Sequence, residues 1–195
     1  MKEIVIASTN AGKIREIKAM LDEIGIEVKS IKDVLEEEID IVEDGTTFKE
    51  NALIKASTLC QMIHKPVLAD DSGLEVNAMD GGPGIYSARF MGYDTSYDIK
   101  NQAIIDACEG KDRGARFVCA MALCIPNEEP IIIEEYFNGQ IHTCIEGENG
   151  FGYDPIFYVP ELHKTSASLT LEEKNQYSHR AKALKKLYEI LKEKI

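Results

Sequence analysis

Apolar and polar positions along the first part of the chain predict a strand, a turn and a helix in succession. The run "IVIA" (residues 4–7) is typical of a short buried strand. Apolar residues then recur at helical spacing, at Ile14, Ile17, Leu21 and Ile24. This pattern predicts a helix that ends at Gly25, so residues 8–13 form a strand-to-helix turn. A second strand is expected near residues 26–31.

A second helical pattern follows an acidic segment, residues 34–44, whose structure the pattern does not decide. Thr47 and Glu50 have the spacing of a helix capping box. The apolar face of the helix behind it is made by Phe48, Ala52, Ala56, Leu59 and Ile63. The next apolar run, "VLAD", predicts a strand that brings two adjacent carboxylates, Asp70 and Asp71, to its end.

The second half of the chain opens with a glycine-rich loop, "NAMDGGPGIYSARF", and a helix expected over residues 97–108 that Gly110 stops. The segments "ARFVCAMALCI", "IIIEEYF" and "QIHTCIE" predict three strands of an antiparallel meander, with turns at "PNEEP" and "NG". Strand–helix alternation followed by hairpins predicts an α/β fold with a mixed sheet. We expect one domain over residues 1–195, built as two lobes.

The long C-terminal helical pattern is expected to contain a break. It begins at Thr170, which forms another capping box with Glu173. Lys174 and His179 are separated by about 140° around a straight helix, so they could not point to one place. We predict a break near Ser178, with Ser178 capping the last helix and placing His179 and Arg180 in its first turn.

Composition and charge narrow the classes of function. The apolar fraction of 44% allows a sizeable core and argues against disorder. The longest apolar run, residues 117–125, is shorter than the ~18 residues that a membrane helix needs, and the N-terminus lacks a signal peptide pattern. A cytoplasmic protein is therefore expected. A net charge of −12 disfavours nucleic acid and membrane as partners, so an anionic substrate would require a local positive pocket or a metal ion.

The five cysteines do not form a metal or disulfide pattern. No C-x-x-C is present, and Cys119 and Cys124 would point to opposite faces of a strand. We therefore expect neither a disulfide framework nor a zinc site, and interpret the cysteines as buried reduced thiols.

The turn "STNAGK" is the first candidate for binding chemistry. It consists of Ser8, Thr9, Asn10, Ala11, Gly12 and Lys13. A helix N-terminus offers backbone N–H groups and a favourable dipole to an anion, and Lys13 adds a positive charge. The motif is not a Walker P-loop, and the alternative is a polar helix cap with a solvated lysine.

The acids near the middle of the chain are the second candidate. Asp71 at a strand end could bind magnesium or accept a proton from water, whereas an Asx-type turn is the alternative. Taken alone, Glu43 is interpreted as a surface acid and Lys55 as a solvated lysine.

The stretch "NGFGYDPIF" is the third candidate. Its glycines let the backbone approach a ligand closely, Phe151 and Tyr153 could stack on a base, and Asp154 could accept a hydrogen bond. The alternative is a turn that leads into a core strand.

The order of these stretches resembles the inosine triphosphate pyrophosphatase family. The resemblance rests on "STNAGK", "FKENALIKA", "LADDSGLEV", "GGPGIYSARF", "GFGYDPIF" and "SHRAKAL", and extends over residues 4–184. It implies an elongated mixed α/β fold with a cleft between two lobes, and a homodimeric hydrolase that uses Mg²⁺, with Mn²⁺ as a possible substitute. The implied reaction converts non-standard purine nucleoside triphosphates (ITP, dITP, XTP) to the monophosphate and pyrophosphate.

The resemblance also implies roles for individual residues. Residues 8–13 match the phosphate-binding loop of the family. Glu43 and Asp71 match its metal site, and Asp71 also matches the residue that accepts the proton. The implied contacts to the substrate and its base are Ser72, Phe151, Gly152, Tyr153, Asp154, Lys174, His179 and Arg180. Lys55 matches a lysine in the second helix of the family.

Two rival functions remain at this point. One is a pyrophosphatase for pyrimidine or modified nucleotides, as in the Maf-like relatives of this fold, against which "GFGYDPIF" and "SHR" argue. The other is a nucleotide-binding sensor without turnover, which would not need the full set of acids and lysines.

Overall fold

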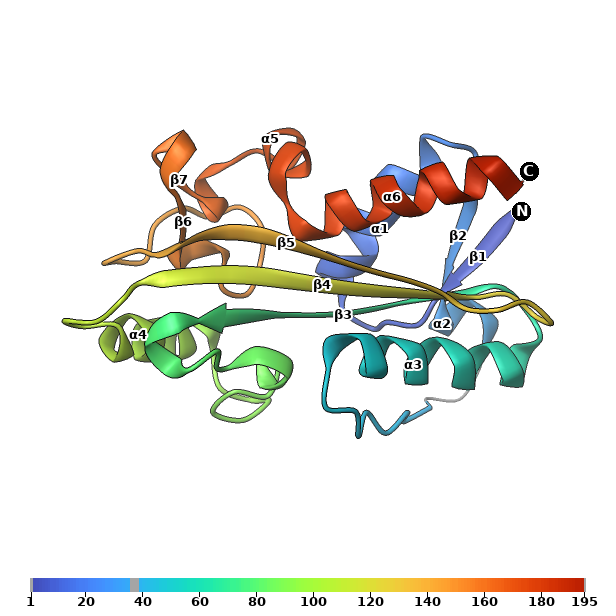
Figure 1. The fold of residues 1–195 in the computed structure, drawn as a ribbon, viewed down its shortest axis with the longest axis horizontal. Helices are drawn as coiled ribbons and strands as arrows, with labels where there is room; N and C mark the ends of the chain where they lie inside the picture. The colour runs from blue at the N-terminus through green and yellow to red at the C-terminus, as the bar shows by residue number, and fades with distance from the viewer. Residues whose placement is uncertain (1, 36–38, 195) are drawn as a thin grey trace. The chain divides into compact units, whose positions relative to one another are not determined.

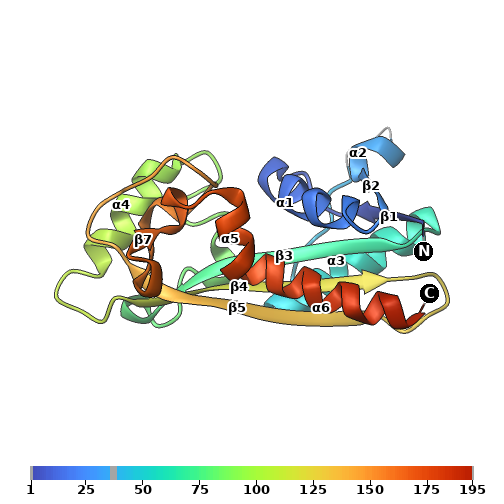
Figure 2. The same ribbon diagram turned by 90° about the horizontal axis from the view of Figure 1, so that it is seen from above.

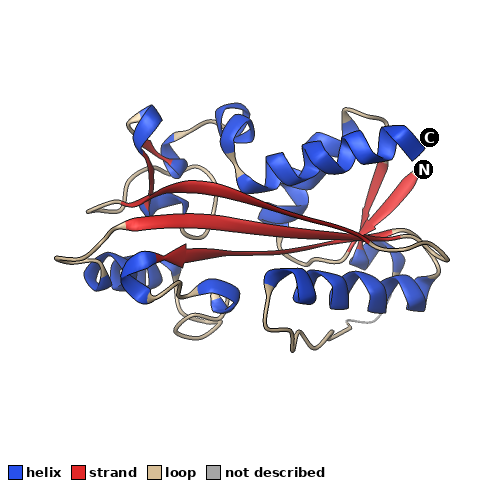
Figure 3. Ribbon diagram, in the orientation of Figure 1, coloured by secondary structure: helices blue, strands red, loops and turns tan. Residues whose placement is uncertain are grey.

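The computed structural model describes residues 2–35 and 39–194 and contains a mixed sheet with flanking helices (Figure 1). The strands, shown in red in Figure 3, have the order β2-β1-β3-β4-β5-β6-β7. β1 pairs in parallel with β2 and β3, whereas β6 pairs antiparallel with β5 and β7. The predicted α/β class with a mixed sheet is confirmed.

Most of the elements lie near their predicted positions. The strands are β1 (Glu3–Ile6), β2 (Glu27–Ser30), β3 (Val67–Val76), β4 (Gly114–Cys124), β5 (Ile131–Ile141), β6 (Phe157–Val159) and β7 (Lys164–Thr165). The helices are α1 (Ala11–Asp22), α2 (Ile31–Val34), α3 (Phe48–Ile63), α4 (Tyr97–Ala107), α5 (Leu171–Tyr177) and α6 (His179–Lys194). Part of the undecided acidic segment, residues 36–38, lies outside the described residues.

The chain forms two compact units, which are described separately. The first unit consists of Met1–Asp71, Cys119–Glu135 and Arg180–Ile195, and the second of Ser72–Val118 and Tyr136–His179. Strands β3, β4 and β5 contribute residues to both. None of the helices among the described residues is long and apolar enough to span a membrane.

The first unit packs helices against both sides of its strands. In Figures 1 and 2, α1 and α6 lie on one side of these strands and α3 on the other. Ile17 and Leu21 of α1 and Leu184 and Leu187 of α6 belong to the same buried cluster as Ile4 of β1. The helical spacing that predicted α1 therefore marks the face that is removed from water.

The second unit has its own core. It gathers Leu74 of β3, Ile104 of α4, Phe117 of β4, Phe137 of β5 and Phe157 of β6, together with other apolar residues. The ring of Phe157 lies 4.4 Å from that of Phe117 and 5.0 Å from that of Phe137, measured between centroids. These aromatic contacts hold the strands around the segment that contains Asp154.

The two predicted capping boxes are confirmed, whereas α1 ends at Asp22, before the predicted stop at Gly25. Thr47 with Glu50 and Thr170 with Glu173 form capping boxes. The break near Ser178 is also confirmed, because Ser178 has extended backbone angles (φ −66°, ψ 149°) between α5 and α6. His179 and Arg180 consequently start α6.

The prediction that a strand ends at the paired acids is wrong. β3 continues through Asp70 and Asp71 to Val76, and the Asx-turn alternative fails for the same reason. Adjacent strand positions point to opposite faces, and each carboxylate meets a lysine: Lys13 for Asp70 and Lys55 for Asp71. Buried acids can remain within a strand because cations on both faces compensate them.

The predicted turn at "NG" is also wrong. Asn138 and Gly139 lie within β5, and residues 142–146 are not a strand. A Cβ on Gly139 would lie 2.6 Å from the carbonyl oxygen of Tyr158 and 2.7 Å from the ring of Phe157. The glycine therefore permits a close approach of β6 and does not form a turn.

All five cysteines are free, as predicted, but one of them is not buried. Cys60, Cys108, Cys119 and Cys124 are buried, whereas Cys144 is exposed. The expectation of buried thiols is therefore wrong for Cys144, which follows β5 in an irregular segment.

Candidate functional site

The turn over residues 8–13 is a capped helix start. The Asn10 Oδ1 accepts hydrogen bonds from the backbone N–H groups of Gly12 at 2.9 Å and Lys13 at 3.1 Å. The Ser8 Oγ accepts one from the N–H of Asn10 at 3.1 Å. Thr9, Asn10 and Ala11 are exposed. The polar cap anticipated as an alternative is present, and the turn is accessible from solvent.

Lys13 points from this turn to a buried carboxylate. Its Nζ lies 2.6 Å from Oδ1 of Asp70, which is 1% exposed. The other oxygen of Asp70 accepts hydrogen bonds from Arg180 Nε at 2.8 Å and from the Cys119 thiol at 3.1 Å. Arg180 also pairs with buried Glu16. Two cations and two carboxylates thus balance in one network.

Ion pairs shift the pKa values of Asp70 and Arg180 in this network. Burial acts to raise the pKa of Asp70, but Arg180 and Lys13 outweigh it and hold that pKa well below its ordinary value. Burial likewise acts to lower the pKa of Arg180, and Asp70 and Glu16 raise it instead. Asp70 and Arg180 are therefore charged at neutral pH.

Sequence reasoning missed Asp70 and Glu16 as members of the site. The pattern placed Asp70 only as the neighbour of Asp71, and Glu16 only within a helix. The one available signal was that Glu16 precedes Ile17 on the apolar side of α1, where an unpaired carboxylate would be costly.

The predicted acids Glu43 and Asp71 are brought together by Lys55 of α3. The Lys55 Nζ lies 3.1 Å from Glu43 Oε2 and 3.6 Å from Asp71 Oδ1, and donates a hydrogen bond to the carbonyl oxygen of Asp70 at 3.0 Å. Lys55 therefore contacts both paired acids of β3. It neutralises part of the negative charge of Glu43 and Asp71.

Asp71 differs from Asp70 in its environment. Burial raises the pKa of Asp71, and the nearby cation Lys55 only partly opposes this effect. Its Oδ2 is buried and has no hydrogen-bond partner among the residues that the structure describes. An orphaned carboxylate oxygen beside a second carboxylate, Glu43, suits a divalent cation with oxygen ligands. These residues fit a metal ion in this respect.

The second unit holds a different charged cluster around Asp154. Its Oδ2 accepts hydrogen bonds from Lys174 Nζ at 2.7 Å and from the Phe151 N–H at 2.9 Å. Its Oδ1 accepts one from Ser166 Oγ at 2.8 Å. Lys174 and Asp154 are both buried. A Cβ on Gly150 would lie 2.1 Å from Asp154 Oδ2, so only glycine allows this turn.

The aromatic residues of this segment are not equally available. Tyr153 is buried, donates a hydrogen bond to the carbonyl oxygen of Ser87 at 2.6 Å, and meets the edge of Tyr97 at 5.2 Å. Burial raises the pKa of Tyr153. Phe151 and Gly152 are half-buried, so Phe151 is the accessible ring of the pair.

His179, Ser72 and Asn101 complete the description of the second unit. The ring of buried His179 stacks on that of Phe117 at 5.0 Å, and Ser72 is half-buried on β3. Asn101 of α4 donates a hydrogen bond to the carbonyl oxygen of Gly152 at 3.2 Å. Its buried Oδ1 has no partner among the described residues, and no sequence pattern singled it out.

The predicted site residues thus fall into two groups. Residues 8–13, Glu43, Asp71 and Arg180 belong to the first unit, and Ser72, residues 151–154, Lys174 and His179 to the second. The structure is that of a mixed α/β protein with lysines at a helix start and beside buried carboxylates. This arrangement suits a protein that binds an anionic ligand together with a cation.

Comparison with known proteins identifies the family to which this chain belongs. The chain belongs to the Ham1 family, whose model matches residues 4–190. It is 49% identical over 193 residues to the dITP/XTP pyrophosphatase of Geobacillus kaustophilus, which covers 97% of this chain and 94% of the relative.

Solved structures agree with this assignment. The Ham1 protein of Staphylococcus aureus matches with a TM-score of 0.89 at 42% identity, covering 100% of both chains. The HAM1 protein of Coxiella burnetii matches with a TM-score of 0.89 at 39% identity, covering 99% of this chain and 100% of that one. The family resemblance drawn from the sequence is confirmed.

Proposed function

We propose that this protein is a nucleoside triphosphate pyrophosphatase that hydrolyses dITP, ITP and XTP. The names of close relatives, such as the dITP/XTP pyrophosphatase that is 49% identical, support the activity and substrate class. The observation on which the mechanism depends is the first-unit group of Lys13, Lys55 and Arg180 beside Asp70 and Asp71. It combines cations for phosphates with a carboxylate that is incompletely compensated.

The lysine side chains would offset the electrostatic repulsion between this acidic protein and a triphosphate substrate. The protein carries a net charge of −12 and the triphosphate is also strongly negative. Lys13 would meet the phosphates from the accessible turn at the start of α1, where the helix dipole favours an anion. Arg180 would act as a positioning residue, because its pairs with Asp70 and Glu16 fix the carboxylate that orients Lys13.

A divalent cation is the implied cofactor. Glu43 and Asp71 would hold Mg²⁺, or Mn²⁺ as a substitute, since each places a carboxylate oxygen within 3.6 Å of the same Lys55 Nζ. When bound, the cation would offset phosphate charge and polarise the phosphorus. Lys55 would keep the two carboxylates apart and limit their repulsion.

Asp71 is proposed as the general base. Water attacks the α-phosphorus, its proton passes to Asp71, and the bond from the α-phosphorus to the bridging oxygen breaks to release pyrophosphate. In the metal-free protein, burial raises the pKa of Asp71, which favours proton acceptance.

The second unit is proposed to recognise the base. Phe151 offers the ring that can stack on it, and Ser72, Gly152, Tyr153, Asp154, Lys174 and His179 shape or contact its surroundings. Hypoxanthine and xanthine carry an oxygen at C6, whereas adenine carries an amino group. A hydrogen-bond donor aimed at C6, such as a backbone N–H or His179, would face the amino group of adenine, which is also a donor. Such an unpaired contact would lower kcat/KM for the adenine nucleotide by ~10⁴-fold or more.

Assembly and location are further parts of the proposal. The family resemblance supports a homodimer, and nucleotide substrates are consistent with the cytoplasm. The net charge of −12 argues against nucleic acid and anionic membranes as partners.

Pyrophosphate release tests this function. We expect purified protein to release pyrophosphate from ITP, XTP and dITP much faster than from ATP or GTP, and only with Mg²⁺ or Mn²⁺. Equal rates on ATP and ITP would contradict the selectivity, and full activity with a chelator would contradict the metal requirement. Preference for a pyrimidine nucleotide would favour the Maf-like rival, and tight ITP binding without turnover would favour a sensor.

A further inference from the structure

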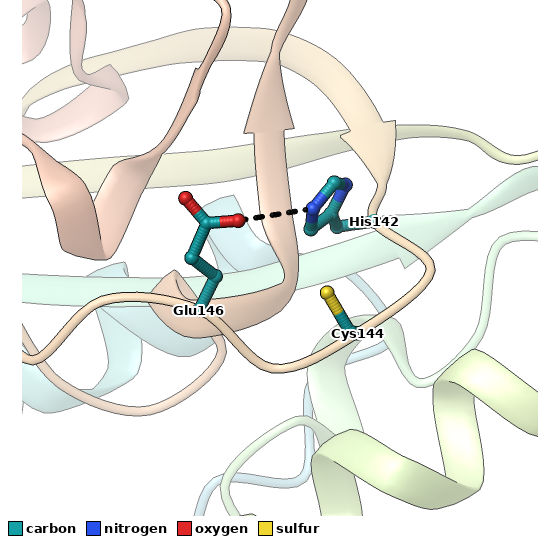
Figure 4. Close-up of side chains that lie close together, drawn as sticks. All are labelled: His142, Cys144 and Glu146. Atoms are coloured by element: carbon teal, nitrogen blue, oxygen red, sulfur yellow. Dashed lines mark ion pairs between the residues drawn. The ribbon is translucent and has the colours of Figure 1, made fainter.

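We propose that His142, Cys144 and Glu146 form a binding site for zinc or a similar borderline-soft divalent cation. One ligand atom from each residue lies within 4.8 Å of the other two, and this is the one such group among the described residues (Figure 4). All three belong to the second unit, and none is a proposed substrate, metal or proton-transfer residue. The inference is therefore independent of the proposed function.

The backbone holds both ends of this segment in place. The N–H of His142 donates to the carbonyl oxygen of Ile156 at 2.7 Å, and Arg113 donates to the carbonyl oxygen of His142 at 2.6 Å. At the other end, the N–H of Glu146 donates to the carbonyl oxygen of Pro155 at 2.9 Å. The carbonyl oxygen of Glu146 also accepts from Thr165 at 2.7 Å. The backbone at the first and third ligands is thus held in place before any ion binds.

The side chains are placed for a shared ligand. The imidazole of His142 stacks on the ring of Tyr158 with centroids 5.0 Å apart and planes inclined by 10°, which restricts its rotation. Its Nε2 lies 3.3 Å from Glu146 Oε2. Figure 4 shows the sulfur of Cys144 directed toward the space beside these two groups. Cys144 is exposed, so its thiol can turn to an incoming ion.

The donor set selects the kind of cation. Imidazole nitrogen, thiolate sulfur and carboxylate oxygen are the ligands that Zn²⁺ takes in tetrahedral sites, with water at the fourth position. Mg²⁺ prefers oxygen ligands alone. In a tetrahedral zinc site these ligand atoms would be separated by roughly 3.4–3.6 Å. Rotation of the exposed Cys144 and Glu146 side chains would close the present separations to that range.

The cysteine spacing gave no reason to expect this site. A zinc site built only from cysteines is not present in the sequence, whereas H-x-C-x-E uses a single cysteine with ligands at alternate positions. Binding would release the thiol proton of Cys144, because the thiolate is the ligand. The four buried cysteines have no comparable access to solvent.

Metal titration of the intact protein tests the site. Zinc binding is measured by calorimetry, and cobalt is added as a spectroscopic probe whose thiolate bond gives a near-ultraviolet absorption. The variants are Cys144→Ser, His142→Ala and Glu146→Gln, and Glu148→Gln is the control because it removes the same charge from an exposed neighbour. We expect affinity to fall by more than ~10-fold in the three variants and to be unchanged in the control. The cobalt absorption should be lost in Cys144→Ser.

A thiol reagent supplies a second readout that does not depend on activity. In the native protein the reagent should modify Cys144 first, and one equivalent of zinc should slow this reaction in the wild type and in Glu148→Gln. Protection should weaken in His142→Ala and Glu146→Gln. Zinc affinity that is equal in all variants, or wild-type protein that neither binds zinc nor is protected, would overturn the proposal. Far-ultraviolet circular dichroism checks that each variant is folded.

Discussion

Each unit contains a lysine–aspartate pair with a buried carboxylate, but the first unit also places a second, incompletely satisfied aspartate beside that pair. Lys174 lies 2.7 Å from Asp154, whose two oxygens accept three hydrogen bonds from the second unit. Lys13 lies 2.6 Å from Asp70, and the next residue, Asp71, keeps a buried oxygen without a partner among the described residues. A satisfied carboxylate holds a loop in place, whereas an unsatisfied one is available for a ligand or a proton.

The largest expected effect concerns activity and Asp71. Asp71→Asn should lower kcat for ITP by ~10²–10⁴-fold, because an amide cannot accept the proton of the attacking water. The same variant should be as stable as the wild type or more stable, since it removes a buried charge that is only partly compensated. Steady-state pyrophosphate release and urea unfolding measure the two quantities.

Asp71 would lose its assigned role if folded Asp71→Asn turned over ITP at close to the wild-type rate. Asp94→Asn is the matched control, because Asp94 is exposed and belongs to neither charged cluster. It should leave kcat and stability unchanged.

The next effect concerns stability and the two satisfied carboxylates. Asp70→Asn leaves Lys13 and Arg180 short of a buried counter-charge, and Asp154→Asn does the same to Lys174. Each should lower the free energy of unfolding by ~3–5 kcal/mol. Urea unfolding at neutral pH measures this loss against the wild type and Asp94→Asn. A loss below about 1 kcal/mol in either variant would show that the pair is not effectively buried.

A smaller expected effect is that Asp70 and Asp71 change the stability of the metal-free protein with pH in opposite directions. The folded pKa of Asp70 is depressed, so its stabilisation is present above the ordinary value of 3.8 and is lost as pH falls toward the folded pKa. The folded pKa of Asp71 is raised by burial, so its ionised form costs stability at neutral pH. That cost diminishes as pH falls through the folded pKa and is gone below 3.8.

Unfolding curves from neutral to acidic pH check these opposite signs. Asp71→Asn should exceed the wild type in stability at neutral pH, and the difference should vanish in acid. Asp70→Asn should be less stable at neutral pH, with a deficit that shrinks only below 3.8. If both variants differed from the wild type in unfolding free energy with the same sign, the contrast between Asp70 and Asp71 would be refuted.

The smallest effect concerns the loop that the second unit positions. Tyr153→Phe removes the hydroxyl that donates to the carbonyl oxygen of Ser87 and should cost about 1 kcal/mol of stability. If the loop recognises the base, KM for ITP should rise while kcat changes little. A variant that instead lost kcat alone would place this loop in the chemical step.

The sequence alone determined the elements, because they depend on local periodicity and on caps between residues three or four positions apart. Helices α1 and α3, the Thr47 and Thr170 capping boxes and the break at Ser178 are all of this kind. The order of the motifs was also sufficient to indicate the family and hence the substrate class. The strand through Asp70 and the role of Gly139 were misread, because each depends on partners remote in sequence.

Only the tertiary structure decided which charges meet. Arg180 reaches Asp70 across 110 positions of the chain, and Lys174 reaches Asp154 across 20. Nothing in a linear pattern distinguishes a lysine that pairs with a buried acid from one in solvent. Burial removes the water that would otherwise screen each charge. Only folding therefore established that Asp70 is compensated and that one Asp71 oxygen has no partner in the part of the chain that the structure describes.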